Sequence, residues 1–200
     1  RKLTRGLIDS KMGIAWTTHM RFEKSLLEDQ VWQDAKASGC KYLHFGYESG
    51  NERVLKLMDK ATTTEIMTKH LKYTAEAGIW NHCMGFFGFP GETREEAWSS
   101  VEFLEQNRDY VHSLGFGTFD LGRHNPVAKH PEKFGVTAYK NPEWDLALDY
   151  YYTVKNGMSI EEAERVFQQF EQNHYAGWDL RLYIREYIFL YIAKFGLEKL

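Results

Sequence analysis

The feature of this sequence that most limits its possible folds is a regular alternation, over residues 12–121, of short apolar runs with longer amphipathic runs. The short runs are rich in β-forming residues and end where glycine or polar residues begin, as buried strands do. Strands that alternate with helices assemble into parallel sheets, so the pattern predicts an α/β fold of parallel βα units. Four strands are too few to close a barrel. The predicted strands are residues 13–18, 42–47, 81–87 and 114–121.

The amphipathic runs carry the boundary signals of helices. Two of them are followed directly by Gly39 and Gly78, and glycine just past a helix is a common stop signal. The third begins with Thr93 and has Glu96 three positions later, a capping box that stabilises a helix start by about 1 kcal/mol. We therefore expect a tight strand-to-helix turn over residues 88–92. The predicted helices are residues 25–38, 64–77 and 93–107.

The last third of the chain has a different character. A segment too irregular for another βα unit predicts a loop over one end of the barrel, since it is punctuated by Pro126, Pro131, Gly135 and Pro142. Three helices are expected after it, and Ser159 with Glu162 repeats the capping box. The sequence thus divides into a partial barrel, residues 1–125, and a loop and helical C-terminal extension, residues 126–200. The three helices are residues 142–154, 159–173 and 180–195.

Charge and cysteine content exclude several classes of partner. The 28 acidic and 25 basic residues are mixed along the chain, without the basic stripe that nucleic-acid binding requires. Only Cys40 and Cys83 are present, which gives neither a disulfide framework nor a CxxC metal spacing and fits the cytoplasm. No membrane-spanning helix is expected, because the most apolar stretch, residues 180–197, is interrupted by Arg181, Arg185, Glu186 and Lys194.

Polar residues gather at the carboxyl ends of the predicted strands. In parallel βα folds these ends hold the ligand, because the loops there vary while the strands keep rigid positions. An acid–base enzyme that uses His19, Glu48 and Asp120 is one interpretation of such a set. The residues at these positions are His19, Arg21, Glu48, Ser49, residues 88–92, Asp120, Arg123 and His124.

Two motifs add a specific resemblance. The first is Gly46-Tyr47-Glu48-Ser49, and the second is Gly88-Phe89-Pro90-Gly91-Glu92-Thr93, with Val54-Leu55-Lys56-Leu57-Met58-Asp59-Lys60 between them. In this order and spacing, roughly residues 12–125 resemble the radical S-adenosylmethionine (SAM) superfamily. The residues within these motifs are most similar to those of members that carry a cobalamin-binding domain. The resemblance implies the rear part of a TIM-like, partial (βα)6 barrel, comprising its third to sixth strands.

The resemblance also implies an enzyme and its cofactors. These are SAM, a [4Fe–4S] cluster and, for the most similar members, cobalamin. The CxxxCxxC loop that holds the cluster follows the first strand in this family, and neither Cys40 nor Cys83 replaces it. The chain also begins at Arg1 without an initiator Met. We therefore expect the rear part of a longer radical SAM enzyme that modifies or methylates a small-molecule or peptide substrate, and no radical activity from this chain alone.

The resemblance assigns roles to particular residues. Glu48 resembles the carboxylate that binds the SAM ribose hydroxyls, and an ionised acceptor suits a vicinal diol. Lys60 resembles the basic residue that meets the methionyl carboxylate, although arginine is common there. Gly88 and the strand before it resemble the adenine side of the site, with one of Phe86 and Phe87 facing the barrel interior. The expected SAM contacts are Glu48, Ser49, Lys60, Phe87, Gly88 and Arg21.

Structural interpretations of the same residues stay open. Glu48 could be a charge at a helix start, Lys60 a solvated surface residue, and Arg21 the partner of a nearby glutamate. A second functional hypothesis is a non-catalytic half-barrel that binds a ligand or protein partner, because an open sheet edge favours strand addition or self-association.

Overall fold

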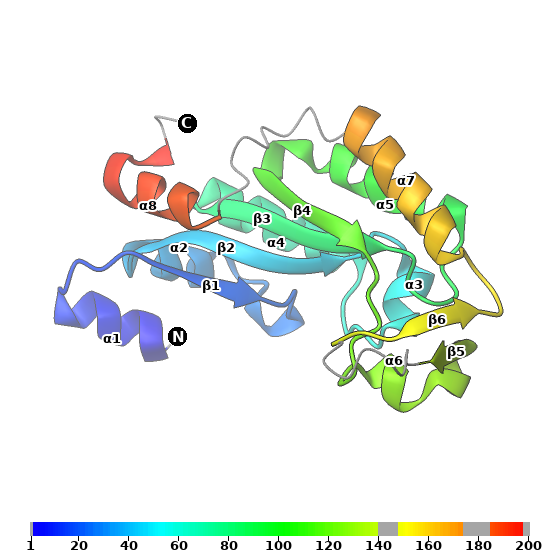
Figure 1. Ribbon diagram of the computed structural model, residues 1–200. Coiled ribbons are helices and arrows are strands. Elements are labelled where there is room, and N and C mark those ends of the chain that lie inside the picture. Colours follow the sequence, from blue (N-terminus) through cyan, green and yellow to red (C-terminus); the bar gives the residue numbers. More distant parts are fainter. Residues whose placement is uncertain (1, 140–147, 174–184, 198–200) are drawn as a thin grey trace.

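The computed structural model describes residues 2–139, 148–173 and 185–197 of the chain. Its main feature is a four-stranded parallel sheet in the order β1-β2-β3-β4, whose strands all point the same way in Figure 1. Helices connect consecutive strands, which confirms the expected α/β fold of parallel βα units. The strands are β1 (Trp16–Met20), β2 (Cys40–Glu48), β3 (Trp80–Phe87) and β4 (Ser113–Thr118).

The first and last strands differ from their predicted ranges. Gly13 has a φ of 63°, which an extended strand does not contain, and β1 begins only at Trp16. β4 ends at Thr118 because the chain leaves the sheet there, and Phe119 and Leu121 pack with the C-terminal part of the molecule. The predictions for the two central strands are correct to within a residue or two at each end.

Helices cover one face of the sheet, with α2, α4 and α5 behind the strands in Figure 1, and α7 (Ile160–Asn173) packs against α5, β3 and β4. Gly39 and Gly78 follow α2 and α4 with positive φ values of 99° and 71°, as expected of stop signals. The predicted helix of residues 25–38 is interrupted, because Glu28 is extended and precedes α2. The elements up to β4 are α1 (Lys2–Ser10), η1 (Lys24–Leu26), α2 (Asp29–Ala37), α3 (Glu52–Leu57), α4 (Thr64–Glu76), α5 (Arg94–Gln106) and η2 (Arg108–Tyr110).

The sheet has two unlike faces, because side chains alternate along each strand. On β2, Leu43, Phe45 and Tyr47 belong to the main hydrophobic core with the helices. Tyr42 and His44 project to the opposite face, which we call the inner face. The main core therefore lies between the sheet and the helices, and the inner face lies on the opposite side of the sheet.

The C-terminal part contains an antiparallel hairpin that the sequence did not predict. β5 (Val136–Tyr139) pairs with β6 (Tyr151–Val154) beyond the carboxyl ends of the main strands (Figure 1). The helix predicted for residues 142–154 is therefore wrong from residue 148 on, because Tyr151–Val154 is a run of β-forming residues, whereas residues 140–147 lie outside the described part. α6 (Pro126–Lys129) and η3 (Pro131–Phe134) precede the hairpin.

Two helices complete the described structure. α7 (Ile160–Asn173) confirms the predicted helix of residues 159–173, and Ser159 and Glu162 exchange both capping hydrogen bonds. α8 (Arg185–Phe195) confirms the end of the last predicted helix, whose first residues lie outside the described part. It places Ile188 and Ile192 against the amino-terminal end of the inner face.

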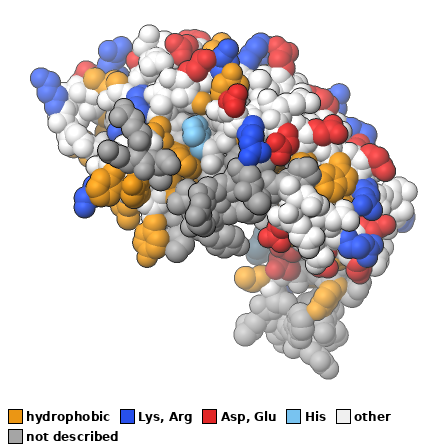
Figure 2. All heavy atoms as spheres, turned by 90° about the horizontal axis from the view of Figure 1, so that it is seen from above, with side chains coloured by type: hydrophobic (Ala, Val, Ile, Leu, Met, Phe, Trp, Pro, Cys, Tyr) orange, Lys and Arg blue, Asp and Glu red, His pale blue; other side chains and the backbone are white. Residues whose placement is uncertain are grey.

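The surface carries charges of both signs. Figure 2 shows lysine, arginine and acidic side chains interspersed on one face, with hydrophobic side chains gathered at one side. Within the described ranges, no helix has the length and apolar character needed to cross a membrane.

Candidate functional site

A cavity of about 780 Å³ lies at the carboxyl ends of the strands. Strand ends supply Arg21, Glu48 and Phe86, and the turn after α3 supplies Lys60. The opposite wall comes from the segment after β4, α6 and η3. Its members include Asp120, Asn125, Lys133 and Phe134. The cavity therefore lies where parallel βα folds place their ligands.

Glu48 is held in an uncommon conformation. Its φ of 62° is left-handed, and the pairing of β2 with β3 shifts register between Gly46 and Glu48. Such a backbone costs a non-glycine residue about 1 kcal/mol or more and often marks a functional site. The side chain folds back over Gly46, where an added Cβ would lie 2.9 Å from Oε1 of Glu48. A larger residue at position 46 would therefore displace the carboxylate of Glu48 from this position.

Lys60 is the cationic partner of this carboxylate. Its Nζ lies 2.9 Å from Oε1 of Glu48, and the two side chains are 33% and 22% exposed. The side chain of Asn51 accepts hydrogen bonds from two backbone N–H groups and begins α3. After α3, Asp59 adopts a φ of 55° and the N–H of Lys60 donates to the carbonyl of Leu55. This short helix and turn bring residues 48 and 60 together.

Aromatic side chains form one wall of the cavity. The rings of Phe86 and Phe119 have centroids 5.6 Å apart, and those of Phe89 and Phe119 lie 5.3 Å apart. Phe134 meets Phe89 edge to face at 5.8 Å. An aromatic wall beside an ion pair suits a ligand with a planar ring at one end and charged groups at the other.

The cavity brings together only part of the predicted site. Arg21, Glu48 and Lys60 line it, and so does Asp120. Burial and the neighbouring Asp149 raise the pKa of Asp120. Ser49 does not line it, because its side chain is fully buried and its Oγ lies 2.9 Å from Oγ of Ser100 on α5.

Phe87 and Gly88 also lie away from the cavity. Phe87 is fully buried on the helix side of the sheet against Phe116 and Phe170, so Phe86 is the phenylalanine that faces the cavity. Gly88 has a φ of 87°, and an added Cβ would lie 2.5 Å from Cβ of Ala163 on α7. The position of Phe87 is therefore a correction, and Gly88 serves close helix packing.

The turn after Gly88 is held by a buried carboxylate. Oε2 of Glu92 accepts a hydrogen bond of 2.6 Å from the N–H of Gly88, and burial raises the pKa of Glu92 to about 7. Its carbonyl accepts from the N–H of Met158, just before α7. The expected capping box of Thr93 and Glu96 is present. This turn joins β3, α5 and α7, and it contributes Phe89 to the cavity wall while Gly88 and Glu92 lie away from the cavity.

Other predicted polar residues lie beside the cavity or away from it. His19 is not among the lining residues, and its ring stacks on that of His44 with centroids 4.5 Å apart. Arg123 and His124 do not line it either, and the N–H of Arg123 donates to the carbonyl of Leu148. The acid–base set of His19, Glu48 and Asp120 is therefore not brought together in full.

Several lining residues were missed by the sequence analysis. Phe86 could have been chosen over Phe87 only if the face of β3 that packs against the helices were known. Some of the others, such as Met58 and Asp59, come from the turn after α3. Most follow β4 in an irregular segment whose return to the cavity no sequence pattern signals, and they include Phe119, Asn125, Lys133 and Phe134.

Cysteine chemistry finds no support in this chain. Cys40 and Cys83 are both fully buried, and burial raises the pKa of Cys40 to about 12 and that of Cys83 further. Among the described residues, no three or more His, Cys, Asp or Glu side chains are arranged to hold a metal ion. These residues do not fit an iron–sulfur cluster, which requires clustered thiolates.

Residues 4–104 match the family profile described as the Radical SAM superfamily. An uncharacterized methyltransferase of Pyrococcus horikoshii is 31% identical over 97 residues, 48% of this chain and 20% of the relative. A cytidylyl-2-hydroxyethylphosphonate methyltransferase of Streptomyces wedmorensis is 28% identical over 58% of this chain and 22% of its own length. The chain thus spans about a fifth of these curated relatives.

Two solved structures share the fold. The radical S-adenosylmethionine methyltransferase TsrM of Kitasatospora setae, with cobalamin and a [4Fe–4S] cluster bound, has a TM-score of 0.59 and 16% identity over 83% of this chain and 34% of its own. Coproporphyrinogen III oxidase of Escherichia coli has a TM-score of 0.57 and 15% identity over 79% and 31%. The fold is thus part of a TIM-like barrel, as expected.

Proposed function

The chain belongs to the radical SAM superfamily, and from that premise we propose that its cavity binds SAM as one wall of a larger enzyme's active site. The observation that carries the proposal is the pairing of Glu48 with Lys60 beside an aromatic wall. SAM has a ribose diol, a zwitterionic methionyl end and a planar adenine. Each of these groups has a suitable side chain in the cavity.

Glu48 would bind the ribose. Both oxygens of an ionised carboxylate accept hydrogen bonds, and a vicinal diol offers two donors. Hydrogen bonds to a charged group contribute about 1.5–3 kcal/mol each. The left-handed backbone of Glu48 and its fold over Gly46 set the carboxylate in place before the ligand arrives. Such preorganisation lowers the entropy lost on binding.

Lys60 would meet the methionyl carboxylate. Its Nζ contacts Glu48 and remains one-third exposed, so it can exchange one carboxylate for another without leaving the cavity. The adenine ring would lie against Phe86 and Phe119, and Arg21 at the opposite strand end remains a further candidate contact. When bound, SAM supplies an activated sulfonium, the source of a methyl group or, on reduction, of a carbon radical.

The residues that would hold the [4Fe–4S] cluster are not assigned to this chain. Cys40 and Cys83 are buried on the sheet, and their raised pKa values disfavour thiolates. We infer that the cluster ligands belong to another part of the enzyme, so the chain alone has no radical activity. An iron–sulfur absorbance band after anaerobic reconstitution of this chain would contradict that inference.

The finer proposal is methyl transfer with cobalamin. Its support is that the names of two sequence relatives describe methyltransferases and that TsrM is a methyltransferase with cobalamin bound. The chain spans a fifth to a third of these proteins, so this activity is proposed for the whole enzyme. No residue described here is assigned to cobalamin. The substrate would be a small molecule or a peptide.

Binding of SAM to the chain tests the proposal. An NMR titration of the backbone amides should show that SAM shifts the signals of residues around the cavity. Glu48→Gln should weaken binding about 10- to 100-fold, the loss of one charged hydrogen bond or more. Glu102→Gln is the matched control, because Glu102 is exposed on α5, away from the cavity. Equal affinity in the Glu48 and Glu102 variants would contradict the ribose assignment.

A further inference from the structure

Three histidines lie side by side on the inner face of the sheet. His19 of β1, His44 of β2 and His82 of β3 are partners in register, and Ser113 of β4 continues the row. Adjacent strands are about 4.8 Å apart, so the row crosses all four strands in one layer. The resemblance to the superfamily assigned none of these side chains a role.

The rings of this histidine row are packed against one another. His19 stacks on His44 at 4.5 Å, and His44 meets His82 edge to face at 5.5 Å. Nδ1 of His82 lies 2.8 Å from Oγ of Ser113, which also accepts a hydrogen bond from the indole N–H of Trp80. These contacts fix the ring orientations, so the row is a built feature of the inner face.

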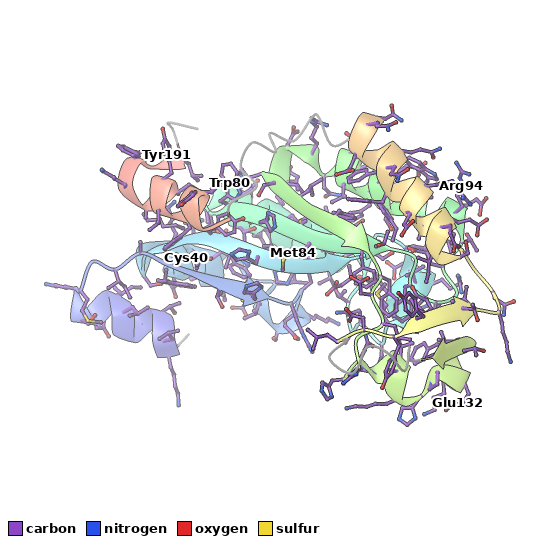
Figure 3. All side chains as sticks on the ribbon, in the orientation of Figure 1. Cys40, Trp80, Met84, Arg94, Glu132 and Tyr191 are labelled. Carbon is purple, nitrogen blue, oxygen red and sulfur yellow. The ribbon has the colours of Figure 1, made fainter. Side chains whose placement is uncertain are left out.

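The histidine row lies between helix α8, which covers the amino-terminal end of the inner face, and the cavity at the carboxyl end. Toward the amino-terminal end, Tyr42 and Trp80 are covered by Ile188 and Ile192 of α8. Toward the carboxyl end, Arg21 follows His19 by two residues, about 7 Å along the strand. Figure 3 labels Trp80 and Met84, which stand on either side of His82 along β3. The row thus lies on the same face as the SAM cavity and one layer deeper.

The side chains that the strands direct to the inner face favour an anion. The one carboxylate that β1 to β4 place there is that of Glu48, and it is paired with Lys60. Asp59 and Asp120 line the cavity beside Arg21 but come from the segments after α3 and β4. Arg21, in the next layer, forms no ion pair with any of the described residues. Imidazole donates N–H hydrogen bonds and gains charge when protonated, and both properties favour oxyanions.

The histidine row is not a metal site. Within residues 2–139, 148–173 and 185–197, no group of three or more His, Cys, Asp or Glu converges on a point that could hold an ion. The rings are stacked along a line, whereas metal ligands direct their lone pairs to one centre.

We propose that the histidine row, with Arg21 above it, binds an anionic oxygen group of the substrate, either a carboxylate or a phosphoryl group. This inference rests on the proposed function, because it places the substrate beside SAM on the inner face. His19 is the exposed member and meets the anion first, while His44 and His82 are largely buried and hold His19 in position. The row therefore selects acidic substrates over neutral ones.

NMR of the histidine side chains in the full chain tests the proposal. Inorganic phosphate and acetate are the probes, with sodium chloride at equal ionic strength as the control. We expect phosphate, acetate or both to shift the signals of His19, His44 and His82 saturably, and the stronger probe indicates the substrate's anionic group. His124, exposed on the segment after β4 and outside the cavity lining, should not respond saturably. The absence of any saturable shift in the row, or an equal shift of His124, would overturn the proposal.

Two variants separate this proposal from SAM binding. His19→Gln changes an exposed residue and should abolish the saturable response while SAM binding persists. Glu48→Gln should weaken SAM binding and leave the response to the anion unchanged. If the wild-type protein binds SAM but shows no saturable anion response, the role of the histidine row is contradicted. If it shows the anion response but does not bind SAM, the proposed function is contradicted.

Discussion

Two strand ends of one sheet carry similar motifs, and the structure uses them in opposite ways. At the end of β2, Glu48 has a positive φ and a part-exposed carboxylate paired with a lysine in the cavity. At the end of β3, Gly88 also has a positive φ, but the carboxylate that follows, Glu92, is fully buried and accepts from the backbone. The ion pair with Lys60 holds the carboxylate of Glu48 at the cavity, whereas backbone N–H groups hold that of Glu92 inside the fold.

The largest expected difference between a residue that supports the fold and one that lines the cavity is at the two phenylalanines before Gly88. Phe87→Ala should lower the free energy of unfolding by about 4 kcal/mol, because a fully buried ring is removed from the core. Phe86→Ala should lower it much less and weaken SAM binding instead, since Phe86 lines the cavity. Urea unfolding and SAM titration of both variants check this. A larger loss of stability for Phe86→Ala would reverse the assignment of faces.

Glycine substitutions give the next largest effect. Gly88→Ala should destabilise the protein by about 3 kcal/mol, because the residue has a positive φ and its Cβ would meet Ala163 at 2.5 Å. Gly117→Ala on β4 is the control, because an added Cβ there meets nothing within 4 Å. Urea unfolding measures both. Equal stabilities would mean that α7 does not pack against this turn.

The sequence predicted the sheet well because its signals are local. The period of the apolar runs, the glycines after α2 and α4 and the capping box at Thr93 each depend on a few neighbouring residues, and all are present in the structure. The hairpin of β5 and β6 was missed because residues distant in sequence pair there, and prolines suggested a loop.

The candidate site was predicted only in part for a related reason. Glu48 and Lys60 were recognised because a motif and a short helix connect them. The choice between Phe86 and Phe87 depended on which face of β3 meets the helices, and two adjacent phenylalanines give no sign of this in the sequence. The histidine row also depends on register, since its members come from three separate strands.

The titration of Glu92 gives a smaller, pH-dependent effect. Its pKa is raised to about 7 in the folded chain, so between pH 4.5 and 7 the unfolded chain ionises this group and the folded chain does not. The contribution of Glu92 to stability is therefore complete below pH 4.5 and lost as pH rises through 7. Relative to Glu92→Gln, wild-type stability should fall by roughly 2–3 kcal/mol over this range.

Urea unfolding at several pH values measures this difference. Carboxylates with lowered pKa values, such as Glu96, act in the opposite direction but are present in both proteins and cancel in the comparison. A difference that stays constant from pH 4 to 8 would show that Glu92 is not buried as a neutral acid, and the contrast with Glu48 would fail.

The most direct test of the central claim, that Glu48 binds the ribose of SAM, is a double cycle. Dissociation constants are measured by NMR titration for SAM and for a 2′,3′-dideoxy analogue, with wild-type protein and Glu48→Gln. We predict that wild type binds the analogue about tenfold or more weakly than SAM, whereas the variant hardly distinguishes them. An equal preference for SAM in both proteins would show that Glu48 does not contact the hydroxyls and would contradict the account.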